Sequence, residues 1–251
     1  MNPHFLNLTG AKLLRTTSWV LGREAILETA QALAIASITG PPGTGKTFLL
    51  SSVSPELRIP VRRLEFDHRA TMRSVSMQML QCLTGEQPSA SKHLLITPLV
   101  EALAQPMVLL VDEAQRLNRE CLDHLRFLHD HPATNFALIL AGGKGCWEVL
   151  GREPQLRRRI YRPVFFRALS SEEVAAYIPQ LHPLWKGVSK NDITRIDAEF
   201  GSGLLGHWAS ITKTLTDLVA AGHTLDRDLF DVALLKHGVL EDPYNDIAPA
   251  A

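Results

Sequence analysis

The stretch of sequence that decides the fold is Gly40-Pro41-Pro42-Gly43-Thr44-Gly45-Lys46-Thr47. It fits the pattern G-x-x-x-x-G-K-[ST], and it lies between a short apolar stretch ending at Thr39 and a segment expected to be helical. Glycines in such a loop let successive backbone N–H groups approach phosphate oxygens, because no Cβ stands in the way. The following helix directs the positive end of its dipole at the same anion. These residues therefore predict a phosphate-binding loop.

Two side chains of this loop have expected roles of their own. Lys46 would place a positive charge on the β- and γ-phosphates of a nucleotide, and the hydroxyl of Thr47 would bind Mg²⁺. The sequence thus predicts ATP and Mg²⁺ as the ligands of the loop.

A second motif consists of the apolar run Val108-Leu109-Leu110-Val111 followed by Asp112 and Glu113. An apolar strand that ends in two acids places both carboxylates at the carboxyl edge of a parallel sheet, where ligands of α/β proteins bind. Asp112 is expected to hold Mg²⁺ through its water shell. Glu113 is expected to orient and polarise the attacking water. Together the two motifs predict an ATPase.

Short apolar strands alternate with helices on both sides of these motifs, which predicts a parallel sheet covered on both faces. We expect this five-stranded α/β ATPase core over residues 21–168, after an irregular lead-in at 1–20. From Ser170 onward the pattern contains helices only, and Ser170 with Glu173 offers a capping-box start. We therefore expect a C-terminal helical lid at 169–238 and a flexible tail at 239–251.

Composition limits the classes of partner. The chain has 251 residues, with 26 Lys and Arg against 26 Asp and Glu, so no overall field attracts it to DNA or to anionic lipid. The three cysteines share no metal-ligand spacing and are expected to be reduced. The N-terminal residues lack a signal-peptide pattern, and the longest apolar runs are far shorter than a membrane span. We expect a soluble cytoplasmic protein that has no membrane partner.

Two further groups are candidates for contact with the γ-phosphate. The strand at 136–141 is expected beside the phosphate loop. Just past it, Lys144 could contact the γ-phosphate, and the alternative is a lysine that is simply exposed to solvent. The run Arg157-Arg158-Arg159 is a candidate arginine finger that would act on a neighbouring subunit, and Arg159 is favoured because it precedes the apolar Ile160. The alternative is a basic helix end that complements its own dipole.

With these motifs in place, the chain resembles AAA+ ATPases over about residues 20–235. The stretch LVDEAQRLNRECLDHLRFLHDHPATNFALILAGGKGCWEVLGREPQLRRRIYRPVFF, at Leu110–Phe166, is similar to the TniB/TnsC group of transposition regulators, relatives of IstB and MuB. Gly22 and Arg23 resemble the short motif that borders the adenine pocket in the initiator-like branch. The resemblance implies an ATP-dependent ring or helical filament that coats target DNA and recruits and stimulates a transposase.

One departure concerns the lid. Such proteins often carry a sensor arginine in a Gly-x-x-Arg context, but here the matching stretch is Gly203-Leu204-Leu205-Gly206-His207-Trp208. Gly206 takes the place of the arginine, which implies slow hydrolysis or another way of sensing nucleotide. His207 is a weak substitute, and a packed or solvated histidine is the alternative.

The resemblance places DNA contacts in the segment after the second strand. Here Arg69, Thr71 and Arg73 are the candidates for contact with phosphates of double-stranded DNA, without sequence specificity. A solvated basic helix face is the equal alternative. Each subunit would add few contacts, which many copies would multiply.

Two other functions remain open from the sequence. One is an ATPase that acts on protein assemblies, as in the ExeA-type secretion-associated group, without a DNA role. The other is a nucleotide switch that serves as an interaction scaffold without hydrolysis, which the missing lid arginine suggests.

Overall fold

The computed structural model describes residues 8–66, 70–85 and 95–239. The chain divides into two compact units. The α/β unit comprises Thr17–Arg167, and the helical unit comprises Ala168–Ala251 together with Met1–Thr16.

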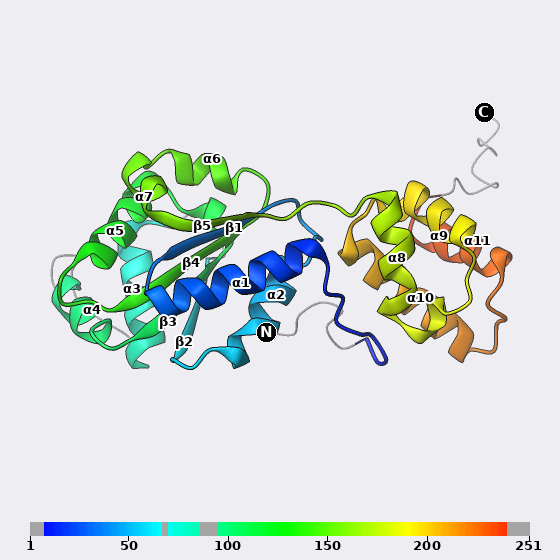
Figure 1. The fold of residues 1–251 in the computed structure, drawn as a ribbon, viewed down its shortest axis with the longest axis horizontal. Helices are drawn as coiled ribbons and strands as arrows, with labels where there is room; N and C mark the ends of the chain where they lie inside the picture. The colour runs from blue at the N-terminus through cyan, green and yellow to red at the C-terminus, as the bar shows by residue number, and fades with distance from the viewer. Residues whose placement is uncertain (1–7, 67–69, 86–94, 240–251) are drawn as a thin grey trace, which may run out of the picture. The chain divides into compact units, whose positions relative to one another are not determined.

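The α/β unit is built on a parallel sheet with the strand order β2-β3-β4-β1-β5 (Figure 1). The strands are β1 Ile35–Thr39, β2 Val61–Glu65, β3 Met107–Asp112, β4 Phe136–Gly142 and β5 Ile160–Phe165. Strand β4 therefore lies between β1 and β3. This order brings the ends of β1, β3 and β4 together at one edge of the sheet, which confirms the expected five-stranded parallel sheet.

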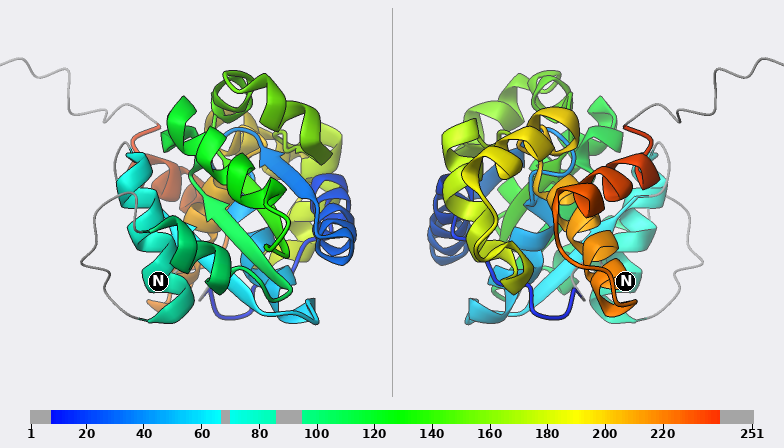
Figure 2. Two further views of the ribbon diagram at one scale, coloured as in Figure 1. Left: turned by 90° about the vertical axis from the view of Figure 1, so that its left-hand side faces the viewer. Right: turned by 90° about the vertical axis from the view of Figure 1, so that its right-hand side faces the viewer.

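Helices cover both faces of this sheet because its central strands are apolar on both sides. Alternate residues of β3 face opposite layers, so Leu109 packs with one core and Leu110 with the other. Helices α1 Thr17–Ala32 and α2 Lys46–Val53 cover one face. The other face packs against α3 Met72–Thr84, α4 Ile96–Ala102, α5 Arg119–Asp130, α6 Cys146–Gly151 and α7 Pro154–Arg159. In the left view of Figure 2 the sheet passes between the dark blue α1 and the cyan and green helices.

The helical unit has its own core. Its α-helices are α8 Ser171–Leu181, α9 Lys190–Ile196, α10 Leu205–Ala220 and α11 Arg227–Lys236, and the right view of Figure 2 shows them from yellow-green to red. The core is centred on the fully buried Trp185 and Trp208, whose ring centroids lie 5.1 Å apart. The indole of Trp185 also donates a hydrogen bond to Thr212 at 2.9 Å.

Some expectations about elements need correction. Helix α1 begins at Thr17, inside the expected irregular lead-in, and ends at Ala32, before β1. The sequence favours a short strand at Val164–Phe166, whereas the strand in the structure is longer and starts at Ile160, directly after α7. Capping explains the predicted start of α8, because Ser170 and Glu173 form the reciprocal capping box. Of the expected tail, residues 240–251 lie outside the described residues.

Among the described residues, no helix combines the length and apolar composition that crossing a bilayer requires. The three cysteines are free thiols, and Cys121 and Cys146 are buried.

Candidate nucleotide-binding site

The phosphate loop connects β1 to α2 and has a backbone that requires glycine. Gly40, Gly43 and Gly45 have φ values of 151°, 76° and 97°, a region that residues with a side chain rarely adopt. At Gly40 a Cβ would also lie 2.2 Å from the carbonyl oxygen of Phe166. The hydroxyl of Thr44 donates to the carbonyl of Pro41 at 2.8 Å, which closes the loop. The loop at the start of α2 therefore has a backbone that depends on glycine, and its binding of phosphate stays a prediction.

Lys46 is the first residue of α2 and is 8% exposed. Its ammonium group donates to the carbonyl oxygens of Gly40 and Pro41, at 2.9 and 2.6 Å. Burial lowers the pKa of Lys46 from its ordinary value, and the negative charges of Asp112 and Glu113 oppose this shift. A partly desolvated cation that lies among carbonyl dipoles is well placed to exchange them for phosphate oxygens.

Asp112 ends β3 and is 3% exposed, and both of its carboxylate oxygens have partners. Oδ1 accepts a hydrogen bond from the backbone N–H of Glu113 at 2.9 Å. Oδ2 accepts one from the guanidinium of Arg63 at 2.6 Å and lies 3.4 Å from the hydroxyl of Thr47. Two oxygen-bearing side chains, one on α2 and one on β3, thus meet beside the phosphate loop. Such a set suits Mg²⁺, which keeps several of its waters.

Glu113 follows directly and takes a left-handed backbone conformation, with φ of 56°. This conformation is uncommon for a residue with a side chain and is often found at functional sites. It ends the strand and starts a single turn over Ala114–Arg116. The carboxylate accepts a hydrogen bond from the amide of Gln115 at 2.6 Å and lies 3.6 Å from the guanidinium of Arg116.

Two residues of this site were not predicted. Arg63 lies on β2, one position away from the buried Leu64, and therefore on the face of the sheet that carries α2 and Asp112. The sequence VRRLE does not alternate between polar and apolar residues, so the placement of Arg63 follows only from the buried Leu64 and the two-residue period of a strand. Gln115 lies two residues after Glu113, and its position in the sequence does not predict that it also contacts the end of β4.

The end of β4 brings Gly142 and Gly143 to this edge. The N–H of Gly143 donates to the side-chain oxygen of Gln115 at 2.9 Å. Lys144, the predicted candidate here, is exposed in the turn after β4. The next buried side chain is Cys146, and burial raises the pKa of its thiol to about 12. Its position beside Lys46 and Glu113 is therefore that of a neutral packing residue.

Gly22 and Arg23 lie on α1. A Cβ on Gly22 would lie 2.5 Å from Leu49, so glycine lets α1 approach α2 closely. The guanidinium of Arg23 pairs with Glu56 at 2.6 Å, and both side chains are about one third exposed. The structure thus shows packing at Gly22 and an ion pair at Arg23, and their role beside an adenine ring stays a prediction.

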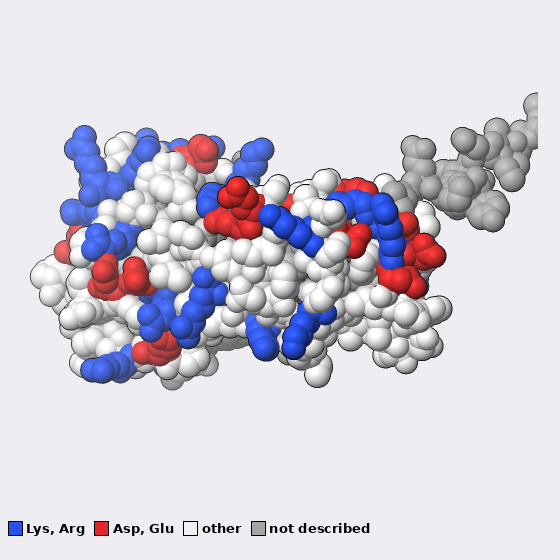
Figure 3. All heavy atoms as spheres, turned by 45° about the vertical axis from the view of Figure 1, so that its right-hand side comes forward, with Lys and Arg blue, Asp and Glu red and all other residues white. Residues whose placement is uncertain are grey.

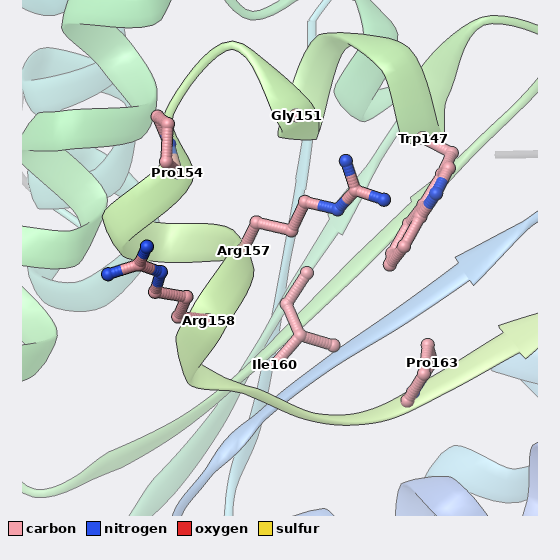
Figure 4. Close-up of a pocket in the computed structure, with 7 residues that line it drawn as sticks. All are labelled: Trp147, Gly151, Pro154, Arg157, Arg158, Ile160 and Pro163. Carbon is pink, nitrogen blue, oxygen red and sulfur yellow. The ribbon is translucent and has the colours of Figure 1, made fainter.

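The three predicted arginines form the last turn of α7. The guanidinium of Arg159 pairs with Asp130 of α5 at 2.8 Å. That of Arg157 lies 4.5 Å from the ring centroid of Trp147. Figure 4 shows Arg157 reaching toward Trp147, whereas Arg158 points the opposite way. No ion pair of Arg158 occurs among the described residues.

A cavity of about 480 Å³ lies beside this turn, along α6, α7 and β5 (Figure 4). Its lining residues are Trp147, Gly151, Pro154, Arg157, Arg158, Ile160 and Pro163. No residue of the phosphate loop lines it, so we place the nucleotide site by the geometry of the loop and of the two acids.

Two of the candidate DNA residues, Thr71 and Arg73, lie at the start of α3. Arg69 lies outside the described residues. Thr71 caps the helix, because its hydroxyl accepts the backbone N–H of Ser74 at 3.1 Å, and both Thr71 and Arg73 are exposed. On the face of the molecule in Figure 3, acidic side chains lie among the basic ones, which agrees with the zero net charge.

In the helical unit, His207 is a packed residue. Its Nδ1 lies 2.8 Å from the carbonyl oxygen of Phe200, and its ring stacks on the Phe200 ring with the two ring centroids 4.9 Å apart. Gly203, in the same stretch, has φ of 67°, and a Cβ there would lie 2.2 Å from the carbonyl oxygen of Leu169. The glycine is therefore a backbone requirement. Gly206, which replaces the expected arginine, lies in the first turn of α10.

Comparison with known proteins agrees with this geometry. Residues 30–150 match the family described as AAA domain. Together with the sheet order, this match gives the chain the AAA+ P-loop NTPase fold. No curated protein sequence matches the chain significantly.

Solved structures resemble the chain in fold. The Aeropyrum pernix ORC2 protein, solved in ADPNP–ADP complexes, is 17% identical with a TM-score of 0.66, over 94% of this chain and 71% of that one. Cdc6p of Pyrobaculum aerophilum is 18% identical with a TM-score of 0.69, over 87% and 65%. The Aeropyrum pernix ORC1 protein in complex with DNA is 15% identical with a TM-score of 0.68, over 93% and 68%. This chain thus spans about two thirds of their lengths.

Proposed function

We propose that this chain hydrolyses ATP, on the premise that residues 30–150 are an AAA domain with the P-loop NTPase fold. One observation carries the proposal. Lys46, Asp112 and Glu113 come from two separate segments and converge at the carboxyl edge of the sheet, beside a loop whose backbone only glycine fits. An anion cradle, a charge and two acids are the parts that phosphoryl transfer requires.

Each residue of the site has its own role in ATP hydrolysis. The backbone of residues 40–47 binds the phosphates, and Lys46 leaves its carbonyl partners to contact β- and γ-phosphate oxygens. Thr47 and, through water, Asp112 would hold Mg²⁺, which neutralises charge on those oxygens. Glu113 accepts a hydrogen bond from a water and aims it at the γ-phosphorus. The oxygen of this water bonds to the γ-phosphorus as the bond from phosphorus to the bridging oxygen breaks, the proton of the water passes to Glu113, and ADP and phosphate form.

Two substitutions test this proposal. Lys46→Ala should abolish ATP binding measured by calorimetry, because the cradle loses its cation. Glu113→Gln should keep binding and lower turnover by about 100-fold or more, the contribution of a positioned base. Normal turnover in purified Glu113→Gln protein would overturn the proposal.

We also propose that the ATP-bound chain forms a ring or helical filament on double-stranded DNA, and that this assembly regulates transposition by recruiting or activating a transposase. Two observations support the DNA part: the likeness in fold to ORC1, solved in complex with DNA, and the exposed start of α3 with Arg73. The resemblance of Leu110–Phe166 to the TniB/TnsC group supports the transposition part.

Gel shifts at several salt concentrations, with a slowly hydrolysed ATP analogue, test the DNA part. Arg73→Ala should weaken DNA binding equally for every DNA sequence. It should also reduce the slope of log affinity against log salt concentration by about one, as expected for the loss of one phosphate contact. Arg58→Ala removes an equally exposed charge from the loop before β2 and serves as the control. ATP turnover without DNA binding at low salt would favour the alternative, an ATPase that acts on protein assemblies.

Target-integration assays with the transposase of the same genetic element test the transposition part. Wild-type protein should raise integration in the presence of ATP, and Lys46→Ala protein should not. Equal integration with and without the protein would remove the transposition role and leave the ATPase proposal standing.

A further inference from the structure

We propose that Gln115 is the positioning residue of the hydrolytic site, holding Glu113 toward the phosphate loop through an amide that bridges the ends of β3 and β4. The inference rests on the proposed ATP hydrolysis. Its basis is a pair of hydrogen bonds made by one side chain. Nε2 donates to Oε2 of Glu113 at 2.6 Å, and Oε1 accepts from the N–H of Gly143 at 2.9 Å.

The direction of these bonds fixes the orientation of the amide. The N–H of Gly143 only donates, so the oxygen of Gln115 must face β4, and its NH₂ group must face the carboxylate. A hydrogen bond to a charged acceptor is short and strong compared with a neutral one. The amide therefore ties the carboxylate of Glu113 to the rigid end of a central strand, and Glu113 itself sits on a turn in a left-handed conformation.

Glu113 follows Asp112, whose carboxylate lies 3.4 Å from the hydroxyl of Thr47 in the phosphate loop. Its negative charge and that of Asp112 both act on the ammonium of Lys46. The carboxylate thus lies within electrostatic reach of the phosphate-binding cation while Gln115 holds Oε2. The part of the chain that the structure describes shows no hydrogen bond to the other carboxylate oxygen of Glu113, Oε1, which can therefore accept one from a water. The contact with Gln115 consequently favours the orientation needed for attack.

The end of β4 is shaped around this amide. A Cβ on Gly142 would lie 2.3 Å from Oε1 of Gln115 and 2.6 Å from the sulfur of Cys146. A Cβ on Gly143 would lie 3.5 Å from Nε2, an ordinary contact. Glycine at 142 therefore leaves room for the Gln115 side chain. No Asn or Thr follows β4 here, and the polar group at this edge comes from Gln115 on the neighbouring strand's turn.

The proposal predicts a specific kinetic signature. Gln115→Ala should lower kcat for ATP by roughly 10- to 100-fold, as expected when a base loses its orientation. KM and the affinity for a slowly hydrolysed ATP analogue should stay within about 2-fold, because Gln115 does not touch the loop 40–47. Gln115→Glu should be at least as damaging, since an ionised carboxylate cannot donate to Glu113 and repels it.

A double-mutant cycle with Gly142→Ala separates positioning from general damage. Gly142→Ala alone should also lower kcat, because its Cβ displaces the amide. Added to Gln115→Ala it should cost less than it does alone, since the amide is already gone and only the close contact with Cys146 remains. Gln180→Ala, which removes an exposed glutamine of α8 in the helical unit, is the matched control and should leave kcat unchanged.

Three outcomes would overturn the inference. Unchanged or higher kcat in Gln115→Ala would show that the amide is inert or restrains Glu113 unproductively. A parallel loss of analogue binding would indicate a structural role only. Fully additive effects of Gln115→Ala and Gly142→Ala would exclude the bridge. Wild-type protein that binds ATP yet never turns it over, alone or with DNA, would overturn the proposed function as well, which distinguishes the two failures.

Discussion

At the scale of single residues, the carboxylate of Asp112 is the most constrained group of the site. It is nearly buried, and the strand end supplies a backbone N–H to one oxygen while Arg63 supplies a guanidinium to the other. A buried carboxylate needs such partners, because an uncompensated charge in a dry site is costly. Oδ2 of Asp112 both accepts the hydrogen bond from Arg63 and lies beside the hydroxyl of Thr47. The guanidinium of Arg63 and a bound Mg²⁺ ion would therefore compete for interaction with this negatively charged oxygen.

This competition gives a prediction for Arg63. Arg63→Gln should lower the Mg²⁺ concentration that gives half-maximal ATP turnover by roughly 3- to 10-fold, because a cation close to the metal position is removed. Arg63→Lys keeps the charge and should keep the metal requirement near that of the wild type. Turnover titrated with Mg²⁺ at fixed ATP measures both. A higher Mg²⁺ requirement in Arg63→Gln would show instead that Arg63 orients Asp112 for the metal.

At the scale of elements, the short helix α7 ends in three arginines with different surroundings. The pair of Arg159 with Asp130 is solvent-accessible, with side-chain exposures of 46% and 26%. Such pairs contribute about 0–1 kcal/mol, so this contact does not prevent Arg159 from reaching a neighbouring subunit. Arg157 is engaged by Trp147 and is the least free of the three to move.

We therefore predict that Arg159→Ala lowers the turnover of the assembled protein, with about 10³-fold as the scale for such arginines, and leaves the ATP affinity of the monomer nearly intact. Turnover measured against protein concentration checks this, because a finger acts only between subunits. Arg158→Ala is the neighbouring control. Loss of turnover in Arg158→Ala alone would assign the finger role to Arg158, and normal turnover in both variants and in Arg157→Ala would exclude a finger here.

A second prediction at this scale concerns the contact of the phosphate loop with the end of β5. Gly40→Ala should destabilise the protein by more than about 2 kcal/mol, because it adds backbone strain and a clash with the carbonyl of Phe166. Gly85→Ala also places alanine at positive φ, 79°, but with no atom within 4 Å of its Cβ, so it should cost only about 1 kcal/mol. Chemical denaturation compares them. An equal loss of unfolding free energy in Gly40→Ala and Gly85→Ala would contradict a steric clash at Gly40.

The central elements of the α/β unit could be predicted because each carries a strong local signal. Strands β3 and β4 are unbroken apolar runs, and α2 follows the glycine pattern. The sequence favours a helix that starts at Gly22, five residues after the observed start of α1 at Thr17, because the buried face of α1 includes Trp19, Gly22 and Thr29 and its periodicity is weak. Gln115 and Arg63 were missed for another reason. Their contacts cross between strands, so strand order decides them, and one sequence does not state that order.

At the scale of the whole molecule, each unit contains a histidine that folding makes harder to protonate. Burial lowers the pKa of His129, despite its hydrogen-bond contact with the carbonyl of Leu33 at 3.1 Å. Burial, with the nearby His207 as a second cause, lowers the pKa of His237. In the unfolded chain both groups titrate near the ordinary value of 6.5.

Below about pH 6.5 the unfolded state thus binds more protons than the folded state. The contribution of the two neutral histidines to the free energy of unfolding is therefore complete above this pH, and it decreases as the pH falls toward the lower pKa values of the folded state. We expect the free energy of unfolding to fall by up to about 1.4 kcal/mol per pH unit through His129, and by less through the more exposed His237 because solvent screens it. Denaturation at about pH 7.5 and about pH 5.5 measures the loss. His129→Gln should reduce it, and an unchanged loss in that variant would exclude His129.

The Phe166 contact reaches beyond the loop itself. Its N–H donates to the carbonyl of Thr39 at 2.7 Å, its carbonyl lies against Gly40, and the boundary between the units follows one residue later, after Arg167. The polypeptide therefore leaves the α/β unit from a point fastened to the first residue of the nucleotide cradle. A change in the backbone of this loop would therefore reach Phe166 and Arg167, the last residues of the α/β unit, through direct contact.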